Sequence, residues 1–143
     1  MFVGDSITDF WLLGDDPWIP GRMHGRRVWD ESFGDAVPQN LALNIGIPGD
    51  RTEHLLQSIL PTSEPARDDE VVRPVNLRLA ALASSSEFAG FTTWLDLYPA
   101  FVDAQGKQDP RLFVDGLHPS EAGYRVWRDR LVPALASARA SVR

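Results

Sequence analysis

Cysteine is absent from the 143-residue chain. This absence excludes disulfide bonds, thiolate metal sites and a cysteine nucleophile. Long apolar runs are also missing, since no stretch approaches the roughly 18 residues that a membrane-spanning helix needs. The first residues show no basic segment followed by an apolar one, which is the pattern of a secretory leader. We therefore expect no membrane span and a cytoplasmic location.

Positive charge is scarce as well. The chain has 14 Lys and Arg against 20 Asp and Glu, which gives a formal net charge of −6 and argues against binding to nucleic acid or to an anionic membrane. Apolar residues make up 43% and charged residues 24%, and these globular values exclude disorder. Because the length suits one ordinary domain and no repeat or linker is visible, we predict a single domain over residues 1–143.

The pattern of apolar and turn-forming residues predicts alternating strands and helices, which is typical of an α/β protein with a mostly parallel sheet. Residues 55–60 either end a helix or form a strand, residues 62–69 and 101–113 are predicted loops, and Pro133 kinks or restarts the last helix. The predicted strands are Phe2–Val3, Leu41–Ile47 and Phe91–Leu97, and the predicted helices are Arg26–Phe33, one from about Thr52, Glu70–Ser84 and one capped by Ser120.

Two short motifs contain the residue types of nucleophilic acyl transfer. Gly4–Thr8 (GDSIT) follows the first predicted strand and contains Ser6, whereas residues 115–119 (DGLHP) precede the last predicted helix and contain Asp115 and His118. A serine attacks, a histidine carries its proton, and an acid orients the histidine. Each motif alone is more often a surface turn or a satisfied polar pair, so their combination and order carry the hypothesis.

These two motifs, together with NIGIPGDRT at residues 44–52, resemble those of the SGNH/GDSL hydrolases over nearly the whole chain. The pattern is most similar to small esterases like the platelet-activating-factor acetylhydrolases. The resemblance implies a flavodoxin-like three-layer α/β/α sandwich and hydrolysis of short-chain, acetyl-type carboxylic esters without a cofactor. It also implies that Ser6 is the nucleophile, His118 the base and Asp115 its orienting acid. The backbone N–H groups of Ser6 and Gly46 would hold the oxyanion, with Asn44 near the same edge.

One family block is missing from this chain. We find no Gly-x-Asn-Asp motif, whose asparagine is the family's third oxyanion donor, and the middle of the chain is short by about one strand–helix unit. Asn76 is no substitute, because it falls inside a predicted helix. Loss of one oxyanion donor slows such reactions by about 10²–10³-fold. The alternative function is therefore a catalytically impaired member that serves as a binding or assembly module.

The shortened middle also bears on assembly. Removal of a central strand leaves unpaired strand edges, which a second chain could pair. We therefore predict a homodimer, with exchanged elements as one way to build it, whose only other partner is a small ester substrate.

Several side chains have more than one interpretation. An aromatic group near the start packs in the core, forms an apolar wall for the substrate, or covers the gap left by the missing strand or meets a partner chain there. His24 and His54 have no acid at a suggestive spacing and are expected to be exposed or capping. No His, Asp or Glu grouping has metal-ligand spacing, so we predict no metal. The aromatic group comprises Phe10, Trp11, Trp18, Trp29 and Phe33.

Overall fold

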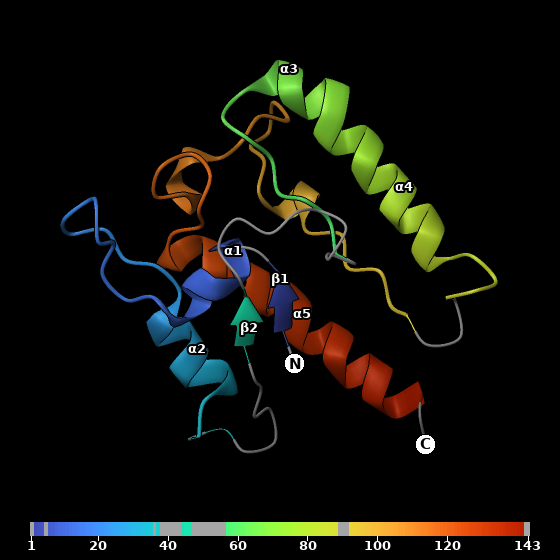
Figure 1. Ribbon diagram of the computed structural model, residues 1–143, viewed down its shortest axis with the longest axis horizontal. Coiled ribbons are helices and arrows are strands. Elements are labelled where there is room, and N and C mark those ends of the chain that lie inside the picture. Colours follow the sequence, from blue (N-terminus) through green and yellow to red (C-terminus); the bar gives the residue numbers. More distant parts are fainter. Residues whose placement is uncertain are drawn as a thin grey trace. The chain divides into compact units, whose positions relative to one another are not determined.

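The computed structural model (Figure 1) describes residues 2–4, 6–35, 37, 44–46, 57–88 and 92–141. The chain forms two units, one from residues 1–55 and 110–128 and the other from residues 56–109 and 129–143. The sequence predicts that the whole chain folds as a single domain, and this stays a prediction. The helix predicted from about Thr52 lies outside the described residues.

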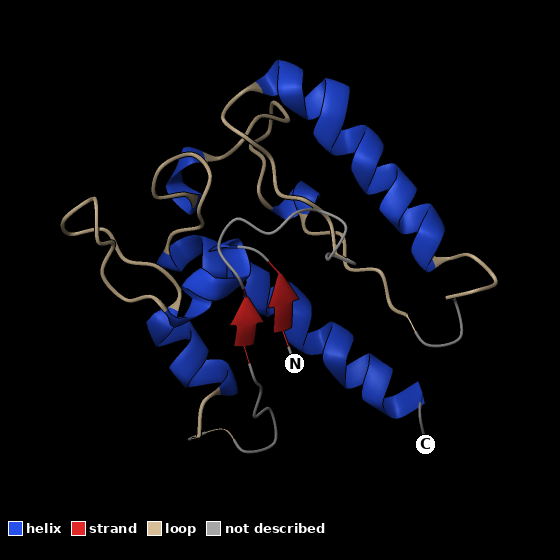
Figure 2. Ribbon diagram, in the orientation of Figure 1, coloured by secondary structure: helices blue, strands red, loops and turns tan. Residues whose placement is uncertain are grey.

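A short parallel sheet lies in the first unit, where Figure 2 shows its two strands side by side. Strand β1 (Phe2–Gly4) pairs with β2 (Asn44–Gly46), with Phe2 opposite Asn44 and Gly4 opposite Gly46. Both strands were predicted, and the remaining residues of the predicted Leu41–Ile47 strand lie outside the described part. Gly4 and Gly46 end the two strands in register, so Gly46 lies opposite the strand end that precedes Ser6 in the chain.

The helices that begin in the first unit follow the sequence pattern closely, and the last of them continues from residue 129 in the second unit. Helix α2 (Arg26–Phe33) has the predicted bounds and is closed by Gly34, whose N–H donates to the Trp29 carbonyl at 3.1 Å. Helix α5 (Glu121–Ser141) begins after Ser120, whose Oγ accepts the Gly123 N–H at 3.3 Å, as its predicted capping role requires. The helix continues through Pro133 and does not restart there. Shorter helical segments are α1 (Ser6–Asp9), η1 (Phe10–Leu12, a 3₁₀-helix) and η6 (Pro110–Leu112, a 3₁₀-helix).

Aromatic side chains form the core of this unit. Trp11 is fully buried, and its ring centroid lies 4.6 Å from that of Tyr124 and 5.4 Å from that of Trp127, both on α5. The Tyr124 hydroxyl donates to the Ile7 carbonyl at 2.6 Å, which ties α5 to α1. The core interpretation of the aromatic group is confirmed for its members other than Trp18, which is 74% exposed; those members are Phe10, Trp11, Trp29 and Phe33.

The second unit contains one long helical segment. It comprises α3 (Pro65–Arg67), the π-helical turn η4 (Asp68–Val72) and α4 (Arg73–Ala83). The predicted loop over residues 62–69 is therefore wrong from Pro65 onwards. Proline suits the first helical position because its fixed φ is helical and its missing N–H is not needed there. The Asp68 carboxylate adds to this start by accepting the N–H and the hydroxyl of Thr62, each at 2.8 Å.

The early start of this helix moves Pro74 from the expected first turn into the interior. In the turn just before it, the Arg73 N–H donates to the Asp68 carbonyl, five residues back. In an α-helix, residue 74 would donate its backbone N–H to the carbonyl four residues back, but proline has no N–H. The π-helical turn η4 lies directly before the position of this missing hydrogen bond.

The described residues of the second unit form no continuous strand. Where the sequence predicts a strand over Phe91–Leu97, its described residues form a single isolated parallel bridge, between Leu95 and Gln57. Residues 57–60 likewise form neither a helix nor a longer strand. The Ser58 hydroxyl instead accepts the N–H groups of Leu97 at 2.6 Å and of Tyr98, at the start of η5 (Tyr98–Ala100, a 3₁₀-helix), at 3.1 Å. The described part of the chain thus contains the helices and the parallel pairing of an α/β protein.

No helix among the described residues has both the length and the apolar character that crossing a bilayer requires.

Candidate active site

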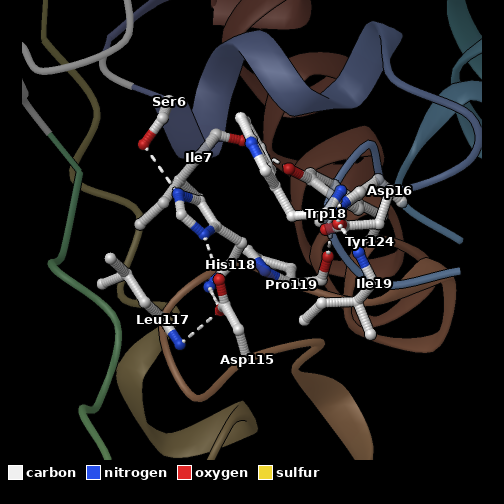
Figure 3. A network of polar contacts seen from close by, with 11 residues as sticks. Ser6, Ile7, Asp16, Trp18, Ile19, Asp115, Leu117, His118, Pro119 and Tyr124 are labelled. Atoms are coloured by element: carbon white, nitrogen blue, oxygen red, sulfur yellow. Dashed lines mark hydrogen bonds and ion pairs between the residues drawn. The ribbon is translucent and has the colours of Figure 1, made fainter. Parts of the chain in front are cut away.

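Ser6, His118 and Asp115 form one continuous chain of hydrogen bonds (Figure 3). The Ser6 hydroxyl lies 3.0 Å from Nε2 of His118, so that it donates to this nitrogen when Nδ1 carries the ring proton. Nδ1 of His118 lies 2.7 Å from Oδ2 of Asp115 and donates to it. The three side chains predicted from opposite ends of the sequence are therefore brought together. Ser6 is the first residue of α1 and follows β1 by two residues in the chain.

A tight turn sets the positions of Asp115 and His118. Oδ1 of Asp115 accepts the N–H groups of Leu117 at 2.9 Å and His118 at 2.8 Å, so one carboxylate holds both the backbone and the ring. Gly116 has a φ of 84°, a conformation that L side chains rarely adopt. The Val114 N–H closes the turn by donating to the His118 carbonyl at 2.8 Å.

The Asp115 carboxylate is held in its charged form. Partial burial alone would raise its pKa, but the hydrogen bonds from the His118 N–H, the His118 ring and the Leu117 N–H outweigh that effect, and the pKa is lowered. An ionised acid beside Nδ1 fixes the tautomer in which Nε2 faces the serine as a proton acceptor.

The surroundings of the His118 ring combine packing with access. Phe10 of η1 stacks on the ring with 4.5 Å between centroids, which fixes the plane of the imidazole. The His118 side chain is nevertheless 16% exposed, Ser6 is half-buried, and the neighbouring Leu117 is 51% exposed. The His118 ring is therefore partly open to solvent.

The other predicted site residues are placed through the backbone of β2. Gly46 lies opposite Gly4, two residues before Ser6 in the chain, whereas Asn44 lies opposite Phe2, further from the edge. Gly46 is thus the better placed of the two for an oxyanion near Ser6. Asn76 lies elsewhere, in α4 of the second unit, where its amide binds both the N–H and the carbonyl of Ile59, at 2.7 and 2.9 Å. This clamp agrees with the structural role expected for Asn76.

The expectation that His24 is exposed or capping is wrong. Its side chain is fully buried, and Nε2 lies 2.7 Å from Oδ2 of Asp16. Two side chains eight residues apart cannot touch along one straight helix or strand, because eight residues rise about 12 Å in a helix and about 26 Å in a strand. Here a loop closed by an antiparallel bridge between Asp15 and Met23 brings them together. The signal in the sequence was the Asp16-Pro17 pair, which is typical of a turn held by an aspartate side chain. His54 lies outside the described residues.

Within the described ranges, no three His, Asp or Glu side chains gather in a way that could hold a metal ion.

Neither a protein-family model nor a curated protein matches the chain. Solved structures do, each with a TM-score of 0.65. A GDSL-like lipase from Bacteroides thetaiotaomicron is 18% identical, with 96% of this chain and 87% of that chain covered. An acylhydrolase candidate from Bacteroides fragilis is 17% identical, with 99% and 86% covered. A protein from Streptococcus pneumonia, described as a candidate platelet activating factor, is 20% identical, with 94% and 82% covered. The chain therefore shares the fold of the GDSL-like lipases and acylhydrolases, as the resemblance of its motifs predicted.

Proposed function

We propose that the protein is a serine esterase that hydrolyses short-chain, acetyl-type carboxylic esters. The observation that carries this proposal is the unbroken path from the Ser6 hydroxyl through the His118 ring to the Asp115 carboxylate, with heavy-atom distances of 3.0 and 2.7 Å. The fold shared with structures named as a lipase and an acylhydrolase candidate supports ester hydrolysis as the reaction class.

The mechanism begins with proton transfer at Ser6. As Oγ attacks the ester carbonyl carbon, Nε2 of His118 takes the hydroxyl proton, and Asp115 stabilises the resulting imidazolium. The carbonyl oxygen becomes an oxyanion, for which we propose the backbone N–H groups of Ser6 and Gly46 as donors, with Asn44 nearby. Collapse expels the alcohol, which takes the proton from His118 and leaves an acyl group on Ser6.

Water then completes the cycle. His118 removes a proton from a water molecule that attacks the acyl carbon, a second oxyanion forms, and its collapse releases the carboxylic acid as the proton returns to Ser6. Every proton moves between the substrate, water and side chains of this chain, so the reaction needs no cofactor.

The test of this proposal compares the wild type with Ser6→Ala on p-nitrophenyl acetate and butyrate. Loss of the nucleophile should lower kcat by at least about 10³-fold. Ser84→Ala is a matched control, because the exposed Ser84 hydroxyl only donates to the Ala80 carbonyl of its own helix; its rate should equal that of the wild type. A fluorophosphonate should label Ser6 in the wild type. Equal rates for wild type and Ser6→Ala, or no label on Ser6, would refute the esterase function.

The alternative is a catalytically impaired protein that serves as a binding or assembly module, and the missing Gly-x-Asn-Asp block favours it. Equal rates for wild type and Ser6→Ala, with both proteins folded, would support this alternative.

For the architecture, we propose a flavodoxin-like three-layer α/β/α sandwich shortened by about one strand–helix unit. The parallel pairing of β1 with β2 supports it, as does the coverage of the three solved structures, of which the chain spans 82–87%. For the assembly, we propose a homodimer.

A further inference from the structure

A second histidine–aspartate pair lies next to the first and takes no part in the mechanism above. His24 and Asp16 have side chains that are 0% and 3% exposed, and Nε2 of His24 lies 2.7 Å from Oδ2 of Asp16. Burial of such a pair is unfavourable unless each polar atom finds a partner. The contacts of this pair therefore indicate what it supports.

Both nitrogens of the His24 ring face acceptors. Nδ1 lies 3.0 Å from the carbonyl oxygen of Pro119, which can only accept, so Nδ1 carries a hydrogen. Nε2 faces the Asp16 carboxylate. Burial would raise the pKa of Asp16, but the hydrogen bond with His24 and those from the N–H groups of Trp18 and Ile19 outweigh it and lower the pKa. The ring is thus fixed at both ends.

The His24 ring reaches His118 by two routes. Pro119, whose carbonyl accepts the Nδ1 hydrogen, directly follows His118 in the chain. Phe10 lies against both rings, with its centroid 4.9 Å from that of His24 in an edge arrangement and 4.5 Å from that of His118 in a stacked one. The two imidazole centroids are 6.3 Å apart. A shift of His24 would therefore disturb both the backbone and the stacking partner of His118.

Asp16 in turn is anchored firmly to its own loop. Oδ1 accepts the N–H groups of Trp18 at 2.7 Å and Ile19 at 2.6 Å, and the Asp16 N–H donates to the Arg22 carbonyl at 2.8 Å. The carboxylate thereby links a closed loop to His24, and His24 links that loop to Pro119 at the end of the DGLHP turn. Figure 3 shows Asp16 with Trp18 and Ile19 of its loop.

We propose that the buried Asp16–His24 pair is a positioning device for His118, which holds the Pro119 carbonyl and the Phe10 ring so that the His118 imidazole stays aligned between Ser6 and Asp115. His24 and Asp16 are positioning residues and do not touch the substrate. The inference rests on the proposed esterase function for its kinetic consequence, but the alignment of His118 can be measured separately.

Two substitutions at His24 separate its two hydrogen bonds. The side-chain amide of His24→Asn can occupy the place of Nδ1 and donate to the Pro119 carbonyl, whereas that of His24→Gln can occupy the place of Nε2 and donate to Asp16. Both remove a buried ring, so both should be less stable than the wild type. We expect kcat per folded molecule to fall about 10–100-fold in the glutamine variant, with KM nearly unchanged. The asparagine variant keeps the contact with Pro119 but loses that with Asp16, so its kcat should fall less, by about 3–10-fold.

The spectroscopic readout is the proton of His118 Nδ1, which a short hydrogen bond to Asp115 moves far downfield in the NMR spectrum. It should broaden slightly in His24→Asn and broaden strongly or disappear in His24→Gln. Asp16→Asn weakens the anchor of His24 but leaves the contact with Pro119 in place, so its resonance should resemble that of His24→Asn, and this variant serves if His24→Gln does not fold. Equal kcat losses in both His24 variants, or an unchanged resonance in His24→Gln and Asp16→Asn, would overturn the inference.

The same NMR comparison in a Ser6→Ala background keeps the two hypotheses distinct. There the His118 resonance reports alignment without any turnover. An inactive wild type with a resonance that depends on His24 would refute the esterase function alone, whereas an active wild type whose resonance ignores His24 would refute the positioning role alone.

Discussion

Two histidine–aspartate pairs of similar geometry lie in different environments. The ring nitrogen and carboxylate oxygen are 2.7 Å apart in both pairs, but the His118 and Asp115 side chains are 16% and 33% exposed, whereas those of His24 and Asp16 are almost fully buried. The ring nitrogen that does not contact the carboxylate is Nε2 in His118, which faces the Ser6 hydroxyl, and Nδ1 in His24, which faces the Pro119 carbonyl. A hydroxyl has a proton to give to a histidine, whereas a carbonyl oxygen can only accept a hydrogen bond. The first pair can therefore take part in proton transfer, and the second can serve only as a structural contact.

The lowered pKa of Asp115 predicts how its contribution to stability depends on pH. A carboxyl whose pKa is lower in the folded state stabilises the fold above the pKa of the unfolded chain, and this stabilisation is lost as the pH falls through the folded-state pKa. Asp115→Asn should therefore be less stable than the wild type near neutral pH, and the difference should shrink as the pH falls below the ordinary carboxyl pKa of about 3.9. Denaturant unfolding over a series of pH values from neutral into this acidic range measures the difference, and a difference that is independent of pH would contradict the prediction.

Gly116 should prove necessary for the geometry of the Asp115 turn. Its φ of 84° costs a side chain about 1–2 kcal/mol, and relief of that strain would shift the Leu117 and His118 N–H groups away from the Asp115 carboxylate. Gly116→Ala should lower kcat on p-nitrophenyl acetate more than it raises KM. Gly116→Asn, which tolerates positive φ better, should lose less. Similar losses of kcat in the two variants would exclude backbone strain as the cause.

At the scale of elements, local signals determined what the sequence could predict. Helix α2 was placed correctly because a helical pattern over Arg26–Phe33 ends at a glycine. The start of the second-unit helix was missed because Pro65 stands in a polar segment that resembles a loop. The alternating pattern of Phe91–Leu97 was interpreted as a strand, but a strand also needs neighbours, and the described residues provide one bridge, at Leu95.

The packing of α5 against η1 should depend on the lack of a side chain at Gly25. A Cβ there would lie 2.8 Å from the Trp11 Cα and 2.9 Å from the Tyr124 ring, both of which are buried. Gly25→Ala should therefore destabilise the protein by about 1–3 kcal/mol and lower its Tm. Gly14→Ala is the matched control, since the nearest atom to its Cβ is 4.0 Å away, and its Tm should stay close to that of the wild type. An equal Tm for wild type and Gly25→Ala would contradict this packing argument.

At the scale of the whole molecule, some residues of the site can be recognised from short sequence motifs, and others become neighbours only when the chain folds. The meeting of Ser6, Asp115 and His118 could be predicted because the two five-residue motifs that contain them together supply the residue types of acyl transfer, in an order that resembles a known family. The Asp16–His24 pair could not, because its partners meet only when a loop closes, and because the contact with Pro119 joins positions 95 residues apart. The supports of a reactive group are thus harder to find in a sequence than the group itself.

The sheet leads to the prediction about assembly. Strand β1 pairs with β2 along one edge, and no other strand in the described part of the chain pairs with it. Backbone N–H and carbonyl groups on an open edge favour pairing with another chain. We therefore expect a homodimer, with a mass near twice 15.9 kDa in light scattering at micromolar concentration. Dilution should shift the mass towards that of the monomer, since association follows mass action. A mass of one chain at the highest concentration tested would rule out the dimer and require the edge to be paired within the chain.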